Sequence, residues 1–125
     1  MTEISNSKQI NKSRYDLEDR SKEFALTVAL FCKKLPYNIV NNEYIKQLIR
    51  SASSVGANYI EANESLGKKD FLMKIRICRK EAKESAYWLA LIVTVNQETM
   101  ATGNKILQEA IELKKIFSAI LEKSK

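Results

Sequence analysis

The chain has 125 residues, of which 45% are hydrophobic, so it can form one domain around one core and is not broadly disordered. Three glycines and one proline predict few turns and long elements, which favours an all-α domain over a sheet protein. The net charge of +6 permits an acidic partner such as nucleic acid, while the absence of histidine removes the commonest general base and metal ligand.

The N-terminal segment, residues 1–14, has no hydrophobic periodicity and is predicted to be a flexible tail before a domain over residues 15–125. It is polar and does not resemble a signal peptide, which favours a cytoplasmic protein. A first helix is predicted from Asp16 to Lys34. It ends there because Pro36 disfavours helical backbone in the residue before it. Its core face is Leu17, Phe24, Val28, Phe31 and Leu35.

The second predicted helix is capped by Asn41 or Asn42, with Glu43 in its first turn. Its predicted core face is Ile45, Leu48, Ile49, Ala52, Val55, Gly56 and Tyr59. A separate small-polar stripe follows steps of four and three through Gln47, Ser51, Ser54, Asn58, Glu61 and Ser65. Two interpretations stay open. The first is close helix packing plus solvent. The second is a network in which Asn58 and Glu61 meet Arg50, Arg76 or Arg79, within the chain or across a subunit interface.

The third predicted helix runs from Lys69 to Gln97 and has three faces. Its core seam, with heptad-like spacing, is Phe71, Ile75, Cys78, Ala82, Ser85, Leu89 and Ile92. A second apolar face indicates a surface left over for a partner, and the third face is basic. Between Lys68 and Lys83 there are seven cations and two anions, a net charge of +5 that is nearly the whole excess.

A fourth helix is predicted from Asn104 to Glu122, with Ile106, Ala110, Leu113, Phe117 and Ile120 inward. Four amphipathic helices with short loops predict an up-down-up-down antiparallel four-helix bundle. Cys32 and Cys78 are far apart, which favours reduced, buried thiols over a disulfide. The longest apolar run, WLALIVTV, is too short to span a bilayer. No membrane role is expected, because the basic face of the third helix is flanked by core positions.

Three sets of residues are candidates for function. The polar-network candidates are Ser51, Ser54, Asn58, Glu61 and Glu84. The candidates for phosphate contacts are Arg50, Arg76, Arg79, Lys80 and Lys83. The candidates for an oligomer interface are Met73, Ile77, Tyr87, Trp88, Leu91 and Val95.

The segments LP, QLIRSASSVGANYIEA and KKDF resemble the bacterial four-helix-bundle proteins encoded in intervening sequences of 23S rRNA genes. The accessory variability proteins of diversity-generating retroelements are similar to that family. The resemblance covers roughly residues 16–122 and is moderately specific. The family pattern matches Arg50, Ser51, Ser54, Val55, Asn58, Glu61, Asp70, Phe71 and Glu84. The chain departs from it at Ala62, where glycine is usual, and at Lys80–Glu81, where the family has Gly-Ser.

The resemblance implies an antiparallel bundle that assembles as a homo-oligomer, a pentameric ring, and a nucleic-acid or reverse-transcriptase partner in the retroelement branch. The residues themselves favour a non-catalytic binding or scaffold module with sequence-nonspecific nucleic-acid binding through the basic face. The alternative is a protein–protein interaction module without nucleic-acid binding. An enzyme is disfavoured because histidine and a phosphate-cradling loop are both absent, and no metal or cofactor is expected.

Overall fold

The computed structural model describes the backbone of residues 2–125 and the side chains of residues 17–125. Over this part, the chain forms the helices α1 (Thr2–Lys33), α2 (Ile39–Asn63), α3 (Lys68–Val95) and α4 (Met100–Lys123), with a 3-10 turn, η1 (Gln97–Thr99), before α4. The predicted all-α four-helix fold is therefore confirmed. The flexible tail predicted for residues 1–14 lies outside the residues whose side chains are described and stays a prediction.

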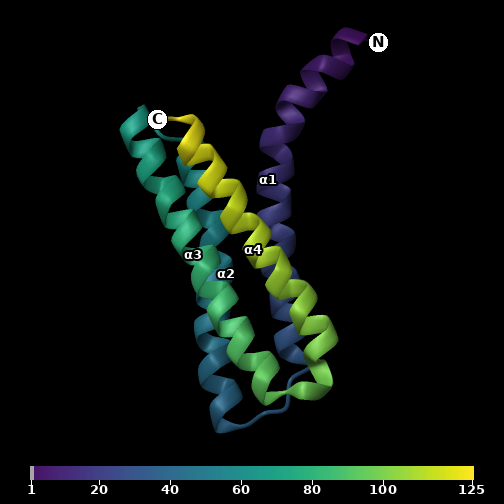
Figure 1. Ribbon diagram of the computed structural model, residues 1–125. Helices are drawn as coiled ribbons and strands as arrows, with labels where there is room; N and C mark the ends of the chain where they lie inside the picture. Colours follow the sequence, from purple (N-terminus) through teal and green to yellow (C-terminus); the bar gives the residue numbers. More distant parts are fainter. Residues whose placement is uncertain (1) are drawn as a thin grey trace.

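The helices run up and down in turn (Figure 1). Contacts join α1 to α2, α2 to α3, α3 to α4 and α4 back to α1, and the most extensive ones are those that α3 makes with α2 and α4. The α1–α2 loop and the α3–α4 connection lie at one end, while the α2–α3 turn and the C-terminus lie at the other (Figure 1). The helix α3 thus has a neighbour on each flank and an outward surface along its whole length.

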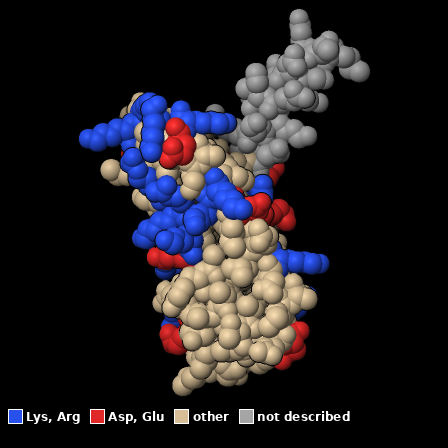
Figure 2. All heavy atoms as spheres, in the orientation of Figure 1, with Lys and Arg blue, Asp and Glu red and all other residues tan. Residues whose placement is uncertain are grey.

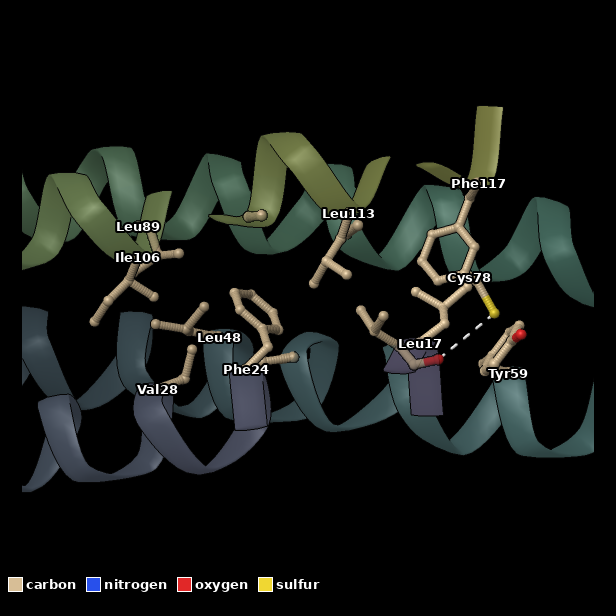
Figure 3. Close-up of a cluster of buried hydrophobic side chains, with 14 of the residues drawn as sticks. Leu17, Phe24, Val28, Leu48, Tyr59, Cys78, Leu89, Ile106, Leu113 and Phe117 are labelled. Carbon is tan, nitrogen blue, oxygen red and sulfur yellow. Dashed lines mark hydrogen bonds between the residues drawn. The ribbon is translucent and has the colours of Figure 1, made fainter. Parts of the chain in front are cut away.

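The core follows the predicted helical spacing. All five predicted α1 core residues are buried, and so is every residue of the α3 seam except Phe71, which packs partly against the core. Figure 3 shows core side chains from all four helices pointing toward one another, with the Cys78 thiol donating to the Val55 carbonyl at 3.5 Å. Ile49 is an exception, because it lies about 100° around the helix from buried Leu48 and is exposed.

The N-terminal cap of α2 differs from the prediction. Asn38, rather than Asn41 or Asn42, has the extended backbone of a cap, and its side-chain oxygen accepts a hydrogen bond from the Asn41 backbone N–H at 2.8 Å. The β-branched pair Ile39 and Val40, which precedes the predicted cap, forms the first turn of α2 and is exposed. Asn41 is thereby carried inside the bundle, where it is almost fully buried.

One close approach joins α3 to α4. A Cβ built on Gly103 would overlap a methyl group of Val93 and lie 3.2 Å from the Phe31 ring. Only a residue without a side chain fits there, so Gly103 lets α4 come close to α3 and α1. Within the described residues, no helix is both long and apolar enough to cross a membrane.

Candidate nucleic-acid interface and its polar neighbours

The basic residues of α3 lie on its outward surface. Arg76, Lys80 and Lys83 are exposed, and Arg79 is half-buried. Figure 2 shows Lys and Arg side chains gathered over the N-terminal part of α3 and the adjoining part of α4, while the other half of this face has few charges. Among the described residues, Lys74 is the only cation of α3 that takes part in an ion pair.

Arg50 is held differently from the other predicted phosphate-binding residues. Its guanidinium contacts Glu81 at 3.4 Å and Glu84 at 2.5 Å, so it joins α2 to α3. The hydrogen bond to Glu81, together with the charges of both carboxylates, raises the pKa of Arg50 above its ordinary value. Because Glu81 is only 6% exposed, this cation compensates a buried anion. We therefore separate Arg50 from the outward stripe of Arg76, Lys80 and Lys83.

The small-polar stripe of α2 faces α3 rather than forming a separate surface. Ser51 is fully buried, and its hydroxyl lies 2.9 Å from that of Ser85 on α3. Farther along, the Glu61 carboxylate accepts from the Lys74 ammonium group at 3.3 Å. Glu84 completes this set through its contact with Arg50. Three of the five predicted network residues thus connect the two helices.

Two predicted network residues bond within their own helix. The Ser54 hydroxyl donates to the Arg50 carbonyl at 2.7 Å, and the Asn58 amide donates to the Ser54 carbonyl at 2.8 Å. Such bonds to the preceding turn satisfy a polar side chain without a partner helix. Within the chain, the contacts therefore favour close helix packing over a network that joins Asn58 and Glu61 to an arginine.

Sequence reasoning missed four residues that complete these polar contacts. Glu81 and Ser85 on α3 are the partners of Arg50 and Ser51, and Asn41 and Asn96 pair elsewhere in the bundle. A signal for the first two existed, because Glu81 and Ser85 are four residues apart, which puts them on one side of a helix. The helical spacing places Ser85 in the predicted core seam, which does not indicate a partner for its hydroxyl.

The predicted interface residues are unevenly exposed. Met73 and Val95 are 52% and 53% exposed, and Tyr87 is 58% exposed. Ile77 and Leu91 are half-buried, and Trp88 packs against the core. Trp88 also contacts two tyrosine rings, Tyr44 at a centroid distance of 6.0 Å and Tyr87 at 5.0 Å. Trp88 is therefore an internal anchor of the α2–α3 contact, while the others leave apolar surface open.

Over the described residues, no three Cys, Asp or Glu side chains lie close enough to hold a metal ion. Both cysteines are buried free thiols. The side chains gathered on α3 offer positive charge and apolar surface.

The comparisons with known proteins agree with this architecture. The family model of the 23S rRNA-intervening sequence protein matches residues 14–119. A solved structure from Bacteroides thetaiotaomicron, described as a protein with unknown function from the S23 ribosomal protein family, is 33% identical, with a TM-score of 0.73. The match covers 84% of this chain and 97% of that one. No curated protein matches. Since the family model spans most of the chain, the chain belongs to the 23S rRNA-intervening sequence protein family.

Proposed function

We propose that this protein is a non-catalytic, oligomeric binding or scaffold module that binds nucleic acid without sequence preference through α3. The observation that supports it is the outward stripe of Arg76, Lys80 and Lys83, three exposed cations without an ion-pair partner among the described residues. Unpaired cations neutralise phosphates and release counterions, which gives affinity that does not depend on base sequence. Neither the family nor the Bacteroides relative is described with a catalytic activity.

The proposal includes self-assembly, with the pentameric ring that the family resemblance implies. Met73 and Val95 expose more than half of their surface on α3, and Ile77 and Leu91 leave part of theirs open, so a second copy could cover an apolar strip. In a ring, the basic stripe repeats in every subunit, which raises avidity. Two buried free thiols support a cytoplasmic location, where thiols stay reduced.

The decisive experiment reverses the stripe. The triple variant Arg76→Glu, Lys80→Glu and Lys83→Glu should lose binding to labelled RNA and DNA in fluorescence anisotropy, while circular dichroism retains the helical signal. The matched control is Lys33→Glu, Lys46→Glu and Lys105→Glu, which changes the net charge equally at exposed positions on the other three helices. Binding lost only in the first variant supports the proposal. Equal loss in both would indicate general charge attraction, and unchanged binding in the first would contradict the proposal.

The second candidate function is a protein–protein interaction module without nucleic-acid binding, with a reverse transcriptase among the partners that the resemblance implies. It is favoured by the exposed apolar side chains at the loop end of the bundle, Tyr37 and Ile39, which are 93% and 82% exposed. Light scattering with and without structured RNA and duplex DNA separates the two. A ring-sized mass that ignores both nucleic acids supports the second candidate, while a monomer contradicts the self-assembly of the first.

A further inference from the structure

The basic stripe continues into an aromatic side chain. Arg76, Lys80, Lys83 and Tyr87 follow one another at steps of four, three and four residues, which puts all four on one side of α3. At a rise of about 1.5 Å per residue, they extend over roughly 16 Å. Tyr87 is one of the candidates for an oligomer interface, but its spacing aligns it with the cations. The stripe therefore offers positive charge along most of its length and a ring at one end.

The ring of Tyr87 is exposed and held in place. It is 58% exposed, and it meets Trp88 edge to face at 5.0 Å and 74°. Trp88 in turn contacts Tyr44 on α2 and packs against the core. A ring supported in this way loses little conformational freedom when another planar group stacks on it, so the entropic cost of stacking is low.

The carboxylates near the stripe already form ion pairs within the chain. Glu81 and Glu84 lie within one or two turns of Tyr87, and Arg50 contacts both carboxylates. Beyond them, residues 85–97 contain no charged side chain. A phosphate chain that follows Arg76, Lys80 and Lys83 toward Tyr87 therefore meets no carboxylate of α3 that lacks a cation. Arg50 pairs with these two carboxylates, so it is left out of the stripe.

We propose that this stripe binds single-stranded nucleic acid, with phosphates on Arg76, Lys80 and Lys83 and one unpaired base stacked on Tyr87. The inference rests on the proposed function and narrows its ligand. A cationic surface beside a rigid aromatic ring is how sequence-tolerant single-strand binders combine charge with stacking. A duplex presents the same phosphates but keeps its bases paired and stacked, so it gains nothing from the ring. The stripe contacts phosphate and base, which RNA and DNA share, so both should bind with similar affinity.

The test measures fluorescence anisotropy with about 12-nucleotide oligouridine, oligothymidine and a duplex of equal length, a size within the usual single-strand site range. Tyr87→Ala should weaken single-strand binding at least about fivefold, the lower bound for one lost stack, without changing duplex binding or the salt dependence. Tyr87→Phe should retain the affinity, because it keeps the ring. The matched control, Tyr37→Ala, removes an exposed tyrosine from the α1–α2 loop and should change nothing.

The outcomes separate this inference from the proposed function. If the triple charge reversal leaves all binding intact, the proposed function fails, and this inference fails with it. If the reversal abolishes binding but Tyr87→Ala leaves single-strand affinity unchanged, only the stacking inference fails. A preference for duplex over single strand, or a drop in assembly mass for Tyr87→Ala in light scattering, would also overturn it, the latter by assigning Tyr87 to the oligomer contact.

Discussion

Asn41 and Asn96 donate hydrogen bonds to each other inside the bundle. The Asn41 amide donates to the Asn96 side-chain oxygen at 3.0 Å, and the Asn96 amide donates back at 2.8 Å. Their remaining amide hydrogens go to the carbonyls of Pro36 and Ile92 at 2.9 Å each. All four side-chain donors are therefore satisfied, and one polar pair ties the α1–α2 loop, the start of α2 and the end of α3 together.

Removing either amide should destabilise the protein. Asn41→Ala or Asn96→Ala leaves the partner amide buried without its hydrogen bond, which costs about 1–3 kcal/mol of unfolding free energy. The double variant should lose less than the sum of the single losses, because the second substitution removes a group that is already unpaired. Urea denaturation of the wild-type protein, the two single variants and the double variant measures these losses. Asn104→Ala, at an exposed position, is the control and should stay within about 0.5 kcal/mol. Additive losses would show that the pair is not coupled.

The core was predictable, but the polar contacts were not. Leu48, Ala52, Val55 and Tyr59 repeat at helical spacing, and burial followed from that spacing alone. The partners Asn41 and Asn96 are 55 residues apart, and their meeting depends on where α2 begins, which the sequence placed a few residues too late. Short polar side chains also find partners through the tertiary fold, so no local pattern indicates which of them will pair.

Charge alone did not indicate the partners of Arg50. Its position on α2 suggested another phosphate ligand beside the basic residues, because a sequence shows cations without showing which carboxylates fold against them. The structure brings Glu81 and Glu84 to it across the α2–α3 contact. The outward stripe of α3 could be predicted from the sequence, because the helical period alone places it away from the core seam.

Replacing Arg50 should destabilise the α2–α3 contact. In Arg50→Met, the buried Glu81 carboxylate loses its cation, and we expect a loss of about 1–3 kcal/mol, below the cost for a fully buried pair because Arg50 is half exposed. Arg50→Met combined with Glu81→Met should recover part of the loss, since an apolar pair leaves no buried charge. Thermal and urea unfolding measure both variants.

The control for this experiment is Lys46→Met. Lys46 and Glu43 form an ion pair at 3.9 Å, and both side chains are mostly exposed, so breaking it should cost at most about 0.5 kcal/mol. If Arg50→Met cost as little unfolding free energy as Lys46→Met, the Arg50 contacts would contribute no more than a surface ion pair. The assignment of Arg50 to a structural role would then be wrong.

A methyl group at Gly103 should destabilise the α3–α4 contact. Gly103→Ala gains about 1 kcal/mol in helix propensity, but its Cβ would overlap the stiff Val93 side chain, and overpacking costs about 1–3 kcal/mol. We expect net destabilisation, measured by urea unfolding. Val93→Ala should relieve the clash. The variant that combines it with Gly103→Ala should therefore be more stable than the sum of the two single losses predicts.

Gly67 offers a contrasting control, because a Cβ there would meet nothing within 4 Å. It is the N-terminal cap of α3 and provides no side-chain hydrogen bond. Gly67→Ser should therefore stabilise the protein by a few tenths of a kcal/mol. Stabilisation by Gly103→Ala as well would mean that α3 and α4 separate easily at this point.

The two buried thiols should make stability fall in alkali. Burial raises the pKa of Cys78 to about 12 and that of Cys32 to about 11, both above the value of 9.0 for an exposed thiol. Between about pH 9 and these values, the unfolded chain loses thiol protons that the folded chain keeps, so the unfolded state is favoured as the pH rises. The stabilising contribution is complete below about pH 9 and is lost progressively above it.

Urea midpoints at pH 8 and pH 10 check the sign of this effect. Lysines and tyrosines also titrate in this range, so the comparison is with a Cys32→Ala, Cys78→Ala variant, in which the fall between the two pH values should be smaller. A thiol-reactive disulfide reagent gives a second measurement at pH 8, because the native thiols should react slowly and the urea-unfolded ones at once. Fast reaction of the native protein would mean that α2 and α3 open around Cys78 far more often than their packing implies.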